Sequence, residues 1–197
     1  MTEKIIRVNI FQKVTQRHFL KKGDEEMVKP TFVNLPQDKK EKITQALLNE
    51  FSNHPLAEAQ VARIVKEAEI ARGAFYKYFE DLSDAYEYLY QLAMKEIHSF
   101  VKAPADYQPE IFYQNVVDFI DQTQSSKYAK LVKMQMLYNE STVSKPFPQD
   151  VLVKLSPQNW SAMVLSHAAI REILAEPTQK ELVLSKLKVG LTLLKKE

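Results

Sequence analysis

The chain has 197 residues, a formal net charge of +2 at pH 7 and no cysteine. The absence of cysteine excludes disulfides, thiolate chemistry and cysteine-ligated zinc, and it fits a reducing cytoplasm. No continuous apolar run is long enough to span a bilayer, and the first residues lack the apolar core of a signal peptide. Three glycines and many Leu, Ala, Lys, Glu and Gln residues favour an all-helical protein.

Residues 1–26 differ in character from the rest of the chain. Residues 5–20 mix apolar and basic residues without a clear period, and a polar linker at residues 21–26 precedes Met27. Two interpretations stay open: translation begins at Met27 and the leader is not native, or residues 1–26 form a flexible arm that adds phosphate contacts. The intact mass of the protein from its native host distinguishes them.

Beyond this part, apolar residues recur at three- and four-residue spacing, which predicts helices. The first helix begins near Asp38, whose side chain can cap the free amide groups, and it ends at residues 53–55. A second, shorter helix follows, with Val61 and Ile64 facing inward and polar residues facing outward.

The segment 68–79, AEIARGAFYKYF, predicts a turn followed by a short helix with two different faces. Phe75 and Phe79 can point toward a core. The other face carries two cations, a phenol and small residues that permit close approach: Arg72, Gly73, Ala74, Tyr76 and Lys77. Such a face suits the major groove of DNA, because cations and hydroxyl groups hold the phosphates at its rims. In an unrelated helical domain, Arg72 and Lys77 would instead be plain solvated charges.

A fourth, long helix is predicted from residues 81–84 to about residue 101, because Pro104 ends it. Two short helices that are joined by a tight turn and flanked by longer helices form a helix-turn-helix unit. Between residues 38 and 102, nine Lys and Arg stand against eleven Asp and Glu. DNA affinity would therefore have to come from the local placement of charge, since phosphate neutralisation usually supplies much of it.

Three segments together resemble the TetR family of one-component bacterial transcriptional regulators. They are ITQALLNEF at residues 43–51, VARIV at residues 61–65 and AEIARGAFYKYF at residues 68–79. The resemblance covers about residues 37–90. Its most specific part is the Gly-x-Phe-Tyr-x-Tyr-Phe signature that closes the third helix. The opening MVKPTFVNLP at residues 27–36 is similar to that of many such regulators from low-GC Gram-positive bacteria.

The resemblance implies an all-α protein of two domains. These are a helix-turn-helix DNA-binding head with a connecting helix at residues 27–102, and a helical ligand-binding and dimerisation domain at residues 103–197. Tyr76 matches a tyrosine that donates its hydroxyl to a phosphate, and Arg72 or Lys77 would bind phosphate or pair with guanine. The DNA-contact positions implied in this way are Gln60, Arg63, Ala71, Arg72, Ala74, Tyr76 and Lys77.

Three residues depart from the family's pattern and indicate weaker anchoring on DNA than average. Ala59 stands where a hydroxyl residue often caps the second helix and binds phosphate. Glu69 replaces the usual glycine of the turn, and its charge would face DNA. A residue with a Cβ costs about 1 kcal/mol at positive φ. Leu82 replaces a common lysine that meets phosphate at the start of the fourth helix.

The second half of the chain carries the pattern of further helices. They are expected at residues 109–123, 127–139, 149–155, 157–174 and 179–195, with a loop at residues 141–148. Ser156 is the expected N-cap of the fourth of these helices, because Pro157 favours its first turn. The last helix is apolar on more than one side, which suits contact with both its own domain and a partner.

The resemblance implies a homodimer in which the last two helices pair with their symmetry mates, with recognition helices about 34–36 Å apart on a palindrome. Residues that would form this contact are Ala162, Ser166, Ala169, Leu187, Gly190 and Leu194, with ordinary packing inside the chain as the alternative. It also implies a pocket for a small apolar effector. The alternative for each candidate residue is ordinary packing in the hydrophobic core. The candidates that would line the pocket are Phe112, Tyr113, Phe119, Met134, Tyr138, Trp160, Met163 and His167.

The sequence thus predicts a cytoplasmic, homodimeric repressor that binds a double-stranded DNA operator and is released by a small-molecule effector. The alternative is a TetR-fold coregulator that acts through protein partners without reading DNA, motivated by Ala59, Glu69, Leu82 and the near-neutral head. The sequence contains no nucleophile–base set, metal motif or phosphate-binding loop, so it predicts no enzyme, cofactor or metal site.

Overall fold

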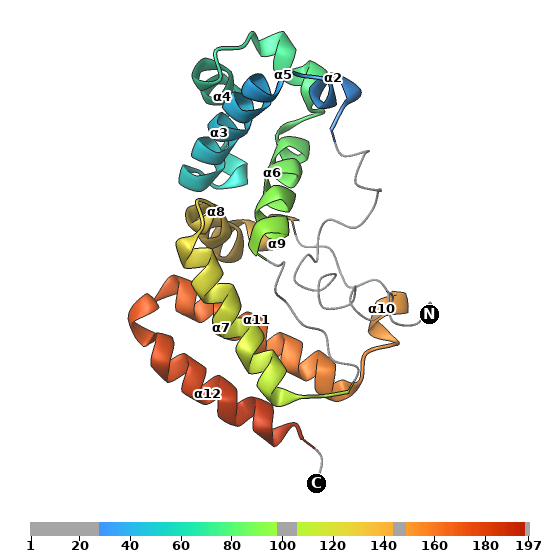
Figure 1. The fold of residues 1–197 in the computed structure, drawn as a ribbon, viewed down its shortest axis with the longest axis vertical. Helices are drawn as coiled ribbons and strands as arrows, with labels where there is room; N and C mark the ends of the chain where they lie inside the picture. The colour runs from blue at the N-terminus through green and yellow to red at the C-terminus, as the bar shows by residue number, and fades with distance from the viewer. Residues whose placement is uncertain (1–27, 98–105, 144–148, 196–197) are drawn as a thin grey trace. The chain divides into compact units, whose positions relative to one another are not determined.

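The computed structural model describes residues 28–97, 106–143 and 149–195 (Figure 1). Within these ranges the regular secondary structure is helical, and no residue belongs to a β-strand. The predicted all-α fold is therefore confirmed. No helix in the same ranges is long and apolar enough to cross a membrane. The expectations for residues 1–26, and for a fourth helix that continues beyond residue 97, lie outside the described residues.

The helices form two compact units. The first combines residues 28–96 with residues 127–142, and the second combines residues 106–126 with residues 149–195. The predicted domain boundary after residue 102 stays a prediction. The grouping of residues 127–142 with the head has no signal in the sequence, because it rests on contacts between segments far apart in the chain.

The first unit is a helix-turn-helix head to which a later segment is added. Its elements are α2 (Pro30–Val33), α3 (Gln37–Asn53), the 3-10 turn Leu56–Glu58, α4 (Val61–Glu67), α5 (Arg72–Tyr78), α6 (Leu82–Ile97), α8 (Ala129–Met134), the π-helical turn Gln135–Asn139 and α9 (Glu140–Val143). Inward-facing side chains of α3 to α5, among them Ile43, Leu47, Ile64 and Phe75, are completely buried. This burial follows the predicted periodicity, because residues three and four apart share one face of a helix.

Two helix ends in this unit differ in how well the sequence predicts them. α3 follows Pro36 without a side-chain cap, so the predicted capping role of Asp38 is wrong; Asp38 lies in the first turn, where its charge still favours the helix N-terminus. α6 starts where predicted. Asp81 accepts a hydrogen bond of 2.9 Å from the Asp84 N–H, and the Asp84 carboxylate accepts one of 2.8 Å from the Glu80 N–H, as in a capping box.

A buried polar cluster joins the later segment to the head. The π-helical turn places Gln135 and Asn139 in the interior, where they are 6% and 1% exposed. The Tyr86 hydroxyl donates to Gln135 at 2.7 Å and accepts from Asn139 Nδ2 at 3.2 Å. Asn139 Oδ1 accepts from the Leu56 N–H at 2.9 Å. Burial raises the pKa of the Tyr86 hydroxyl, so this group stays a protonated donor.

The helical path through this cluster also corrects a boundary. The polar run after Tyr138 predicts a loop from residue 141, but the helix continues to Val143. The reason is that Asn139 is buried and hydrogen-bonded to the head, which keeps a residue typical of turns inside a helix.

The second unit is a group of three mutually packed helices with two short additions. Its elements are α7 (Pro109–Ser125), α10 (Gln149–Leu152), α11 (Pro157–Ala175), the 3-10 turn Pro177–Gln179 and α12 (Lys180–Leu193). Ser156 caps α11 as predicted, since its side chain accepts a hydrogen bond of 3.1 Å from the Asn159 N–H. An ion pair of 2.8 Å between Lys180 and Asp121 joins α12 to α7.

Candidate DNA-binding surface

The third helix of the head, α5, has one buried face and one open face. Phe75 and Phe79 are fully buried and Tyr78 is 7% exposed, so three aromatic rings anchor the helix to the core. Tyr76 keeps 43% of its surface exposed, which leaves this large polar ring available to a partner outside the head. The exposed residues on the open face are Ala71, Arg72, Gly73, Tyr76 and Lys77, and Ala74 is half-buried.

Gly73 has no structural partner that requires its small size. A Cβ atom placed on it would meet no heavy atom within 4 Å, and its φ is not positive. Neither packing inside the chain nor backbone conformation therefore explains a glycine in this short helix, where glycine is unfavourable. Its position on the open face is compatible with the close approach of a molecule from outside.

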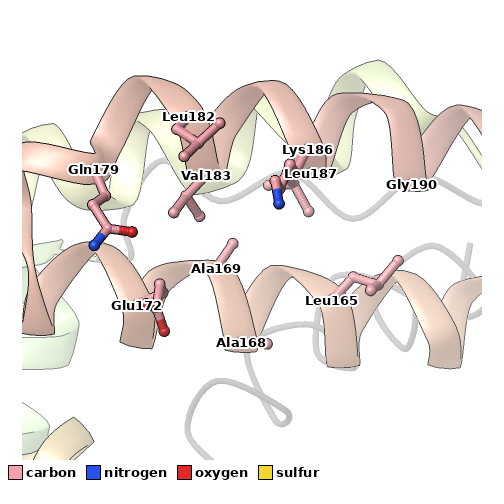
Figure 2. Close-up of a pocket in the computed structure, with 10 residues that line it drawn as sticks. All are labelled: Leu165, Ala168, Ala169, Glu172, Gln179, Leu182, Val183, Lys186, Leu187 and Gly190. Carbon is pink, nitrogen blue, oxygen red and sulfur yellow. The ribbon is translucent and has the colours of Figure 1, made fainter.

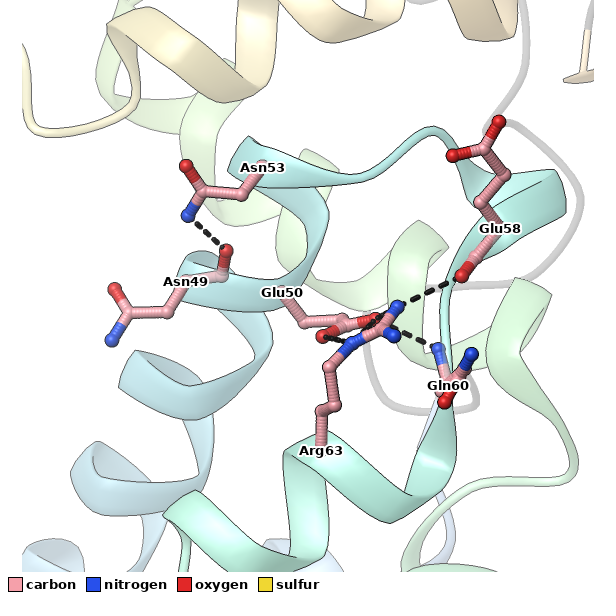
Figure 3. A network of polar contacts seen from close by, with 6 residues as sticks. All are labelled: Asn49, Glu50, Asn53, Glu58, Gln60 and Arg63. Carbon is pink, nitrogen blue, oxygen red and sulfur yellow. Dashed lines mark hydrogen bonds and ion pairs between the residues drawn. The ribbon is translucent and has the colours of Figure 1, made fainter.

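On the second helix, the predicted contact Arg63 is held by a carboxylate from α3 (Figure 3). Arg63 Nε donates to Glu50 Oε2 at 2.8 Å, and Arg63 Nη2 donates to Glu50 Oε1 at 2.6 Å and to the Glu58 carbonyl at 2.8 Å. Glu50 is only 4% exposed, whereas the Arg63 side chain is 37% exposed. The cation of Arg63 is thus already paired within the head, and its role toward DNA stays a prediction.

The same carboxylate also serves the start of α4. Glu50 Oε1 accepts a hydrogen bond of 2.7 Å from the backbone N–H of Gln60, the residue that precedes the helix. Glu50 therefore supplies an acceptor and a negative charge at a helix N-terminus, where Ala59 supplies neither. Burial would raise the pKa of Glu50, but the hydrogen bonds from Arg63 and Gln60 and the charge of Arg63 outweigh it and lower the pKa below its usual value.

Sequence reasoning missed Glu50 although one signal for it exists. Glu50 follows Ile43 by seven residues and Leu47 by three, so a carboxylate occupies the apolar stripe of α3. A charged residue on such a stripe is almost never fully buried unless it is paired. The identity of the partner, thirteen residues further along the chain, could not be read from local periodicity.

The turn between α4 and α5 depends on the backbone of Glu69, which has a φ of 51°. The Ile70 N–H donates to the Val65 carbonyl at 3.0 Å and the Glu69 N–H donates to the Lys66 carbonyl at 3.4 Å, which is the Schellman pattern of a helix C-terminus. Glu69 therefore adopts the left-handed conformation, for which the family's usual glycine carries no steric cost. The Glu69 carboxylate pairs with Lys42 of α3, so its charge is partly neutralised inside the head.

Replacing Glu69 with glycine is expected to raise the melting temperature by about 2–4 °C, because glycine adopts positive φ without a steric cost. The lost ion pair offsets little of this gain, since both partners are exposed to solvent. Thermal unfolding of Glu69→Gly is compared with that of the control Glu69→Gln, which removes the charge but keeps the Cβ. The comparison separates the effect of backbone conformation on stability from the effect of the lost ion pair. An equal rise in the glutamine variant would contradict the account, because glutamine keeps the Cβ.

The residues predicted to line an effector pocket are divided between the two units. Met134 and Tyr138 lie in the first unit, and Tyr138 is 59% exposed. In the second unit, α7 and α11 pack against each other and carry the other candidates. Of these, Phe112, Phe119 and Met163 are buried, Tyr113 and His167 are half-buried and Trp160 is exposed. The pocket stays a prediction.

The residues predicted for the dimer contact also separate into two groups. Ala162 and Ser166 are buried inside the second unit, in agreement with the alternative of packing within the chain. Ala169, Leu187 and Gly190 line a groove of about 390 Å³ between α11 and α12 (Figure 2). Leu194 is half-buried at the end of α12. The other residues that line the groove are Leu165, Ala168, Glu172, Gln179, Leu182, Val183 and Lys186.

A helix-turn-helix head with an open, cationic third helix defines a class of DNA-binding protein, and comparison with known proteins gives the family. Residues 43–81 match the model described as bacterial regulatory proteins, tetR family. No curated protein sequence matches the chain significantly. Together with the all-helical fold, the match confirms the resemblance: residues 43–81 form a helix-turn-helix region of the TetR-family type.

One solved structure supports the fold, and two others are more distantly similar. A TetR family transcriptional regulator from Chloroflexus aurantiacus J-10-FL is similar with a TM-score of 0.52 and 19% identity, over 85% of this chain and 96% of that one. The fatty acid degradation regulator FadR from Bacillus halodurans has a TM-score of 0.46 and 16% identity, over 78% and 96% of the two chains. NalD of Pseudomonas aeruginosa, the secondary repressor of the MexAB-OprM multidrug efflux pump, has a TM-score of 0.45 and 14% identity, over 78% of this chain and 96% of that one. The first likeness, with its TM-score above 0.5, supports the fold alone.

Proposed function

We propose that the protein is a cytoplasmic homodimeric repressor that binds a palindromic DNA operator through α5 and is released by a small, largely apolar ligand. The observation that carries the DNA-binding part is the open face of α5. Arg72, Tyr76 and Lys77 are exposed there beside Gly73, which leaves space for a close approach. Arg72 and Lys77 supply cations for phosphate or guanine, and Tyr76 supplies a hydroxyl for phosphate.

The groove between α11 and α12 supports the dimer. Leu165 and Leu182 line it and are 38% and 56% exposed, so the groove presents apolar side chains to solvent. Val164, Val189 and Leu193 on the same two helices are also exposed. A second copy that covers this apolar surface would complete a four-helix bundle and hold two heads at a fixed spacing.

A charged residue in the groove is expected to convert the dimer to a monomer. Leu182→Glu places a carboxylate where the partner's apolar surface would lie, so that association would require burial of an unpaired charge. Val153→Glu is a matched control, since Val153 is 77% exposed and does not line the groove. Sedimentation should show a monomer for the first variant and a dimer for the control. A dimer in both would place the interface elsewhere.

Coupling of an effector to DNA binding is proposed to pass through α6, which follows the recognition helix directly. Support comes from the buried cluster in which Tyr86 of α6 bonds Gln135 and Asn139 of the later segment. A ligand that displaced this segment would break contacts to α6 and to Leu56, just before α4. Such a ligand would act by favouring one of two arrangements of the heads.

The proposal is tested by selecting bound sequences from random duplex DNA with the purified chain. A palindromic consensus supports a dimeric DNA reader. The alternative, a coregulator that acts through protein partners, gains weight from the pairing of Arg63 with Glu50, which removes one cation from the DNA-facing helices. No enrichment at low salt by a folded dimer would favour that alternative. With an operator in hand, Tyr76→Ala should weaken operator binding sharply, and it should leave a partner-binding coregulator unaffected.

A further inference from the structure

The C-terminal end of α5 is held by a short segment that precedes the first long helix. A helix leaves its last four carbonyl groups without partners inside the helix. In α5 these are the carbonyls of residues 76–79. The Lys29 ammonium donates to the Tyr76 carbonyl at 2.9 Å and to the Phe79 carbonyl at 3.3 Å. The Lys29 backbone N–H donates to the Tyr78 carbonyl at 3.2 Å.

Thr31 completes this set of contacts. Its hydroxyl donates to the Lys77 carbonyl, so that each of the four terminal carbonyls accepts a hydrogen bond from residue 29 or residue 31. The Lys29 cation also lies at the negative end of the helix dipole. Both side chains are exposed to solvent, so neither is needed to fill the core.

Phe32, a buried aromatic residue next to Thr31, holds the segment that carries Lys29 and Thr31 against the core. Phe32, on α2, is 2% exposed. Its ring centroid lies 5.8 Å from that of Tyr78, 5.0 Å from that of Phe79 and 5.1 Å from that of Tyr88. The segment at residues 29–33 is thus docked on α5 itself and on α6.

We propose that Lys29 and Thr31 are positioning residues for DNA binding, which hold the last turn of α5 so that Tyr76 and Lys77 keep a fixed direction. The inference rests on the proposed function, because it assigns a role within that same surface. α5 has seven residues, and a helix of this length is marginal without outside contacts. Tyr76 and Lys77, both exposed, lie in the last turn of the helix, which would fray first.

The test uses the full chain, with Thr31→Val as the main variant. Valine keeps the shape of threonine and removes the donor, at an exposed position that the fold tolerates. Thr31→Ser restores the donor and is the rescue control. The first measurement is amide hydrogen exchange in the free protein. The Phe79 N–H, which bonds the Phe75 carbonyl at 2.9 Å, should lose protection about 3–10-fold in the valine variant and regain it with serine.

The second measurement is affinity for the selected duplex as a function of salt. Thr31→Val and Lys29→Met should bind about 3–10-fold more weakly with the salt slope of the unmodified chain. Lys77→Gln, which removes one phosphate contact from each of the two heads, should lower the slope by about 1.8. A slope lowered by Lys29→Met would make Lys29 a phosphate contact and overturn its positioning role.

The two measurements separate the inference from the function on which it rests. Wild-type exchange and wild-type affinity in Thr31→Val would overturn the positioning role. A chain that binds no duplex contradicts the proposed function, and the exchange measurement then still decides whether residues 29 and 31 hold the helix end.

Discussion

Leucine in place of Gly73 is expected to leave the head folded and to abolish operator binding. A Cβ at this exposed position meets no heavy atom of another part of the head within 4 Å, so the fold leaves room for a side chain here. Leucine also favours helix over glycine by up to about 1 kcal/mol. In the complex, the same side chain would occupy the space between α5 and the base edges, so affinity should fall by more than about 100-fold, or about 2.7 kcal/mol.

Two measurements are needed. Thermal unfolding gives the stability of the variant, and fluorescence anisotropy with the selected duplex gives its affinity for DNA. Val153→Leu is the control, since it also enlarges a side chain that is exposed, at 77%, and Val153 lies outside both the head and the groove. The control should keep the affinity of the unmodified chain. Tight operator binding by Gly73→Leu would mean that this face of α5 does not enter the groove.

Methionine in place of Arg63 is expected to lower the melting temperature by about 6–12 °C at neutral pH. The change leaves the Glu50 carboxylate, 4% exposed, without the cation that holds it. Glu50→Gln should lower the melting temperature less than Arg63→Met does. Glutamine keeps an oxygen acceptor for the Gln60 N–H, and the Arg63 side chain, at 37% exposure, can be hydrated. Urea unfolding of the two variants at several pH values measures the difference.

The contribution of Glu50 to stability should change with pH in opposite directions in the unmodified chain and in Arg63→Met. In the unmodified chain the pKa of Glu50 is lowered, so its stabilisation is present above the ordinary glutamate pKa of about 4.3 and is lost as the pH falls through the lowered value. In Arg63→Met, burial remains while the main opposing contacts are gone, so the pKa of Glu50 is raised. The variant should then lose stability as the pH rises from about 4 to 7. A loss of equal size at all pH values would contradict this account.

The sequence predicts best the features that are set by local spacing. The stripe that contains Ile43 and Leu47 is buried as expected, Ser156 caps the helix that begins beside it, and the two faces of α5 follow from the alternation of Phe75 with its polar neighbours. The turn that contains Glu69 also lies where the sequence predicts it, between the two short helices. In each case the residues that determine the feature lie within one or two helical turns.

The features that the sequence does not predict depend on partners far along the chain. Lys29 meets carbonyls 47 and 50 residues away, and Asn139 bonds Leu56 across 83 residues. Hydrophobic periodicity carries no information on such pairs. The sequence therefore assigns no role to α2 and does not group the segment that contains Asn139 with the head. The same limit applies to the pairing of Arg63 with Glu50.

The salt dependence of operator binding decides whether paired heads bind DNA through the cations of α5. Arg72 and Lys77 of two heads neutralise about four phosphates, so the logarithm of the binding constant should fall linearly with that of the salt concentration, with a slope of about −3.6. In Lys77→Gln, the slope should fall to about half of this value, because two of the four contacts are removed. A folded dimer that shows no salt-dependent binding to any selected duplex would contradict the account.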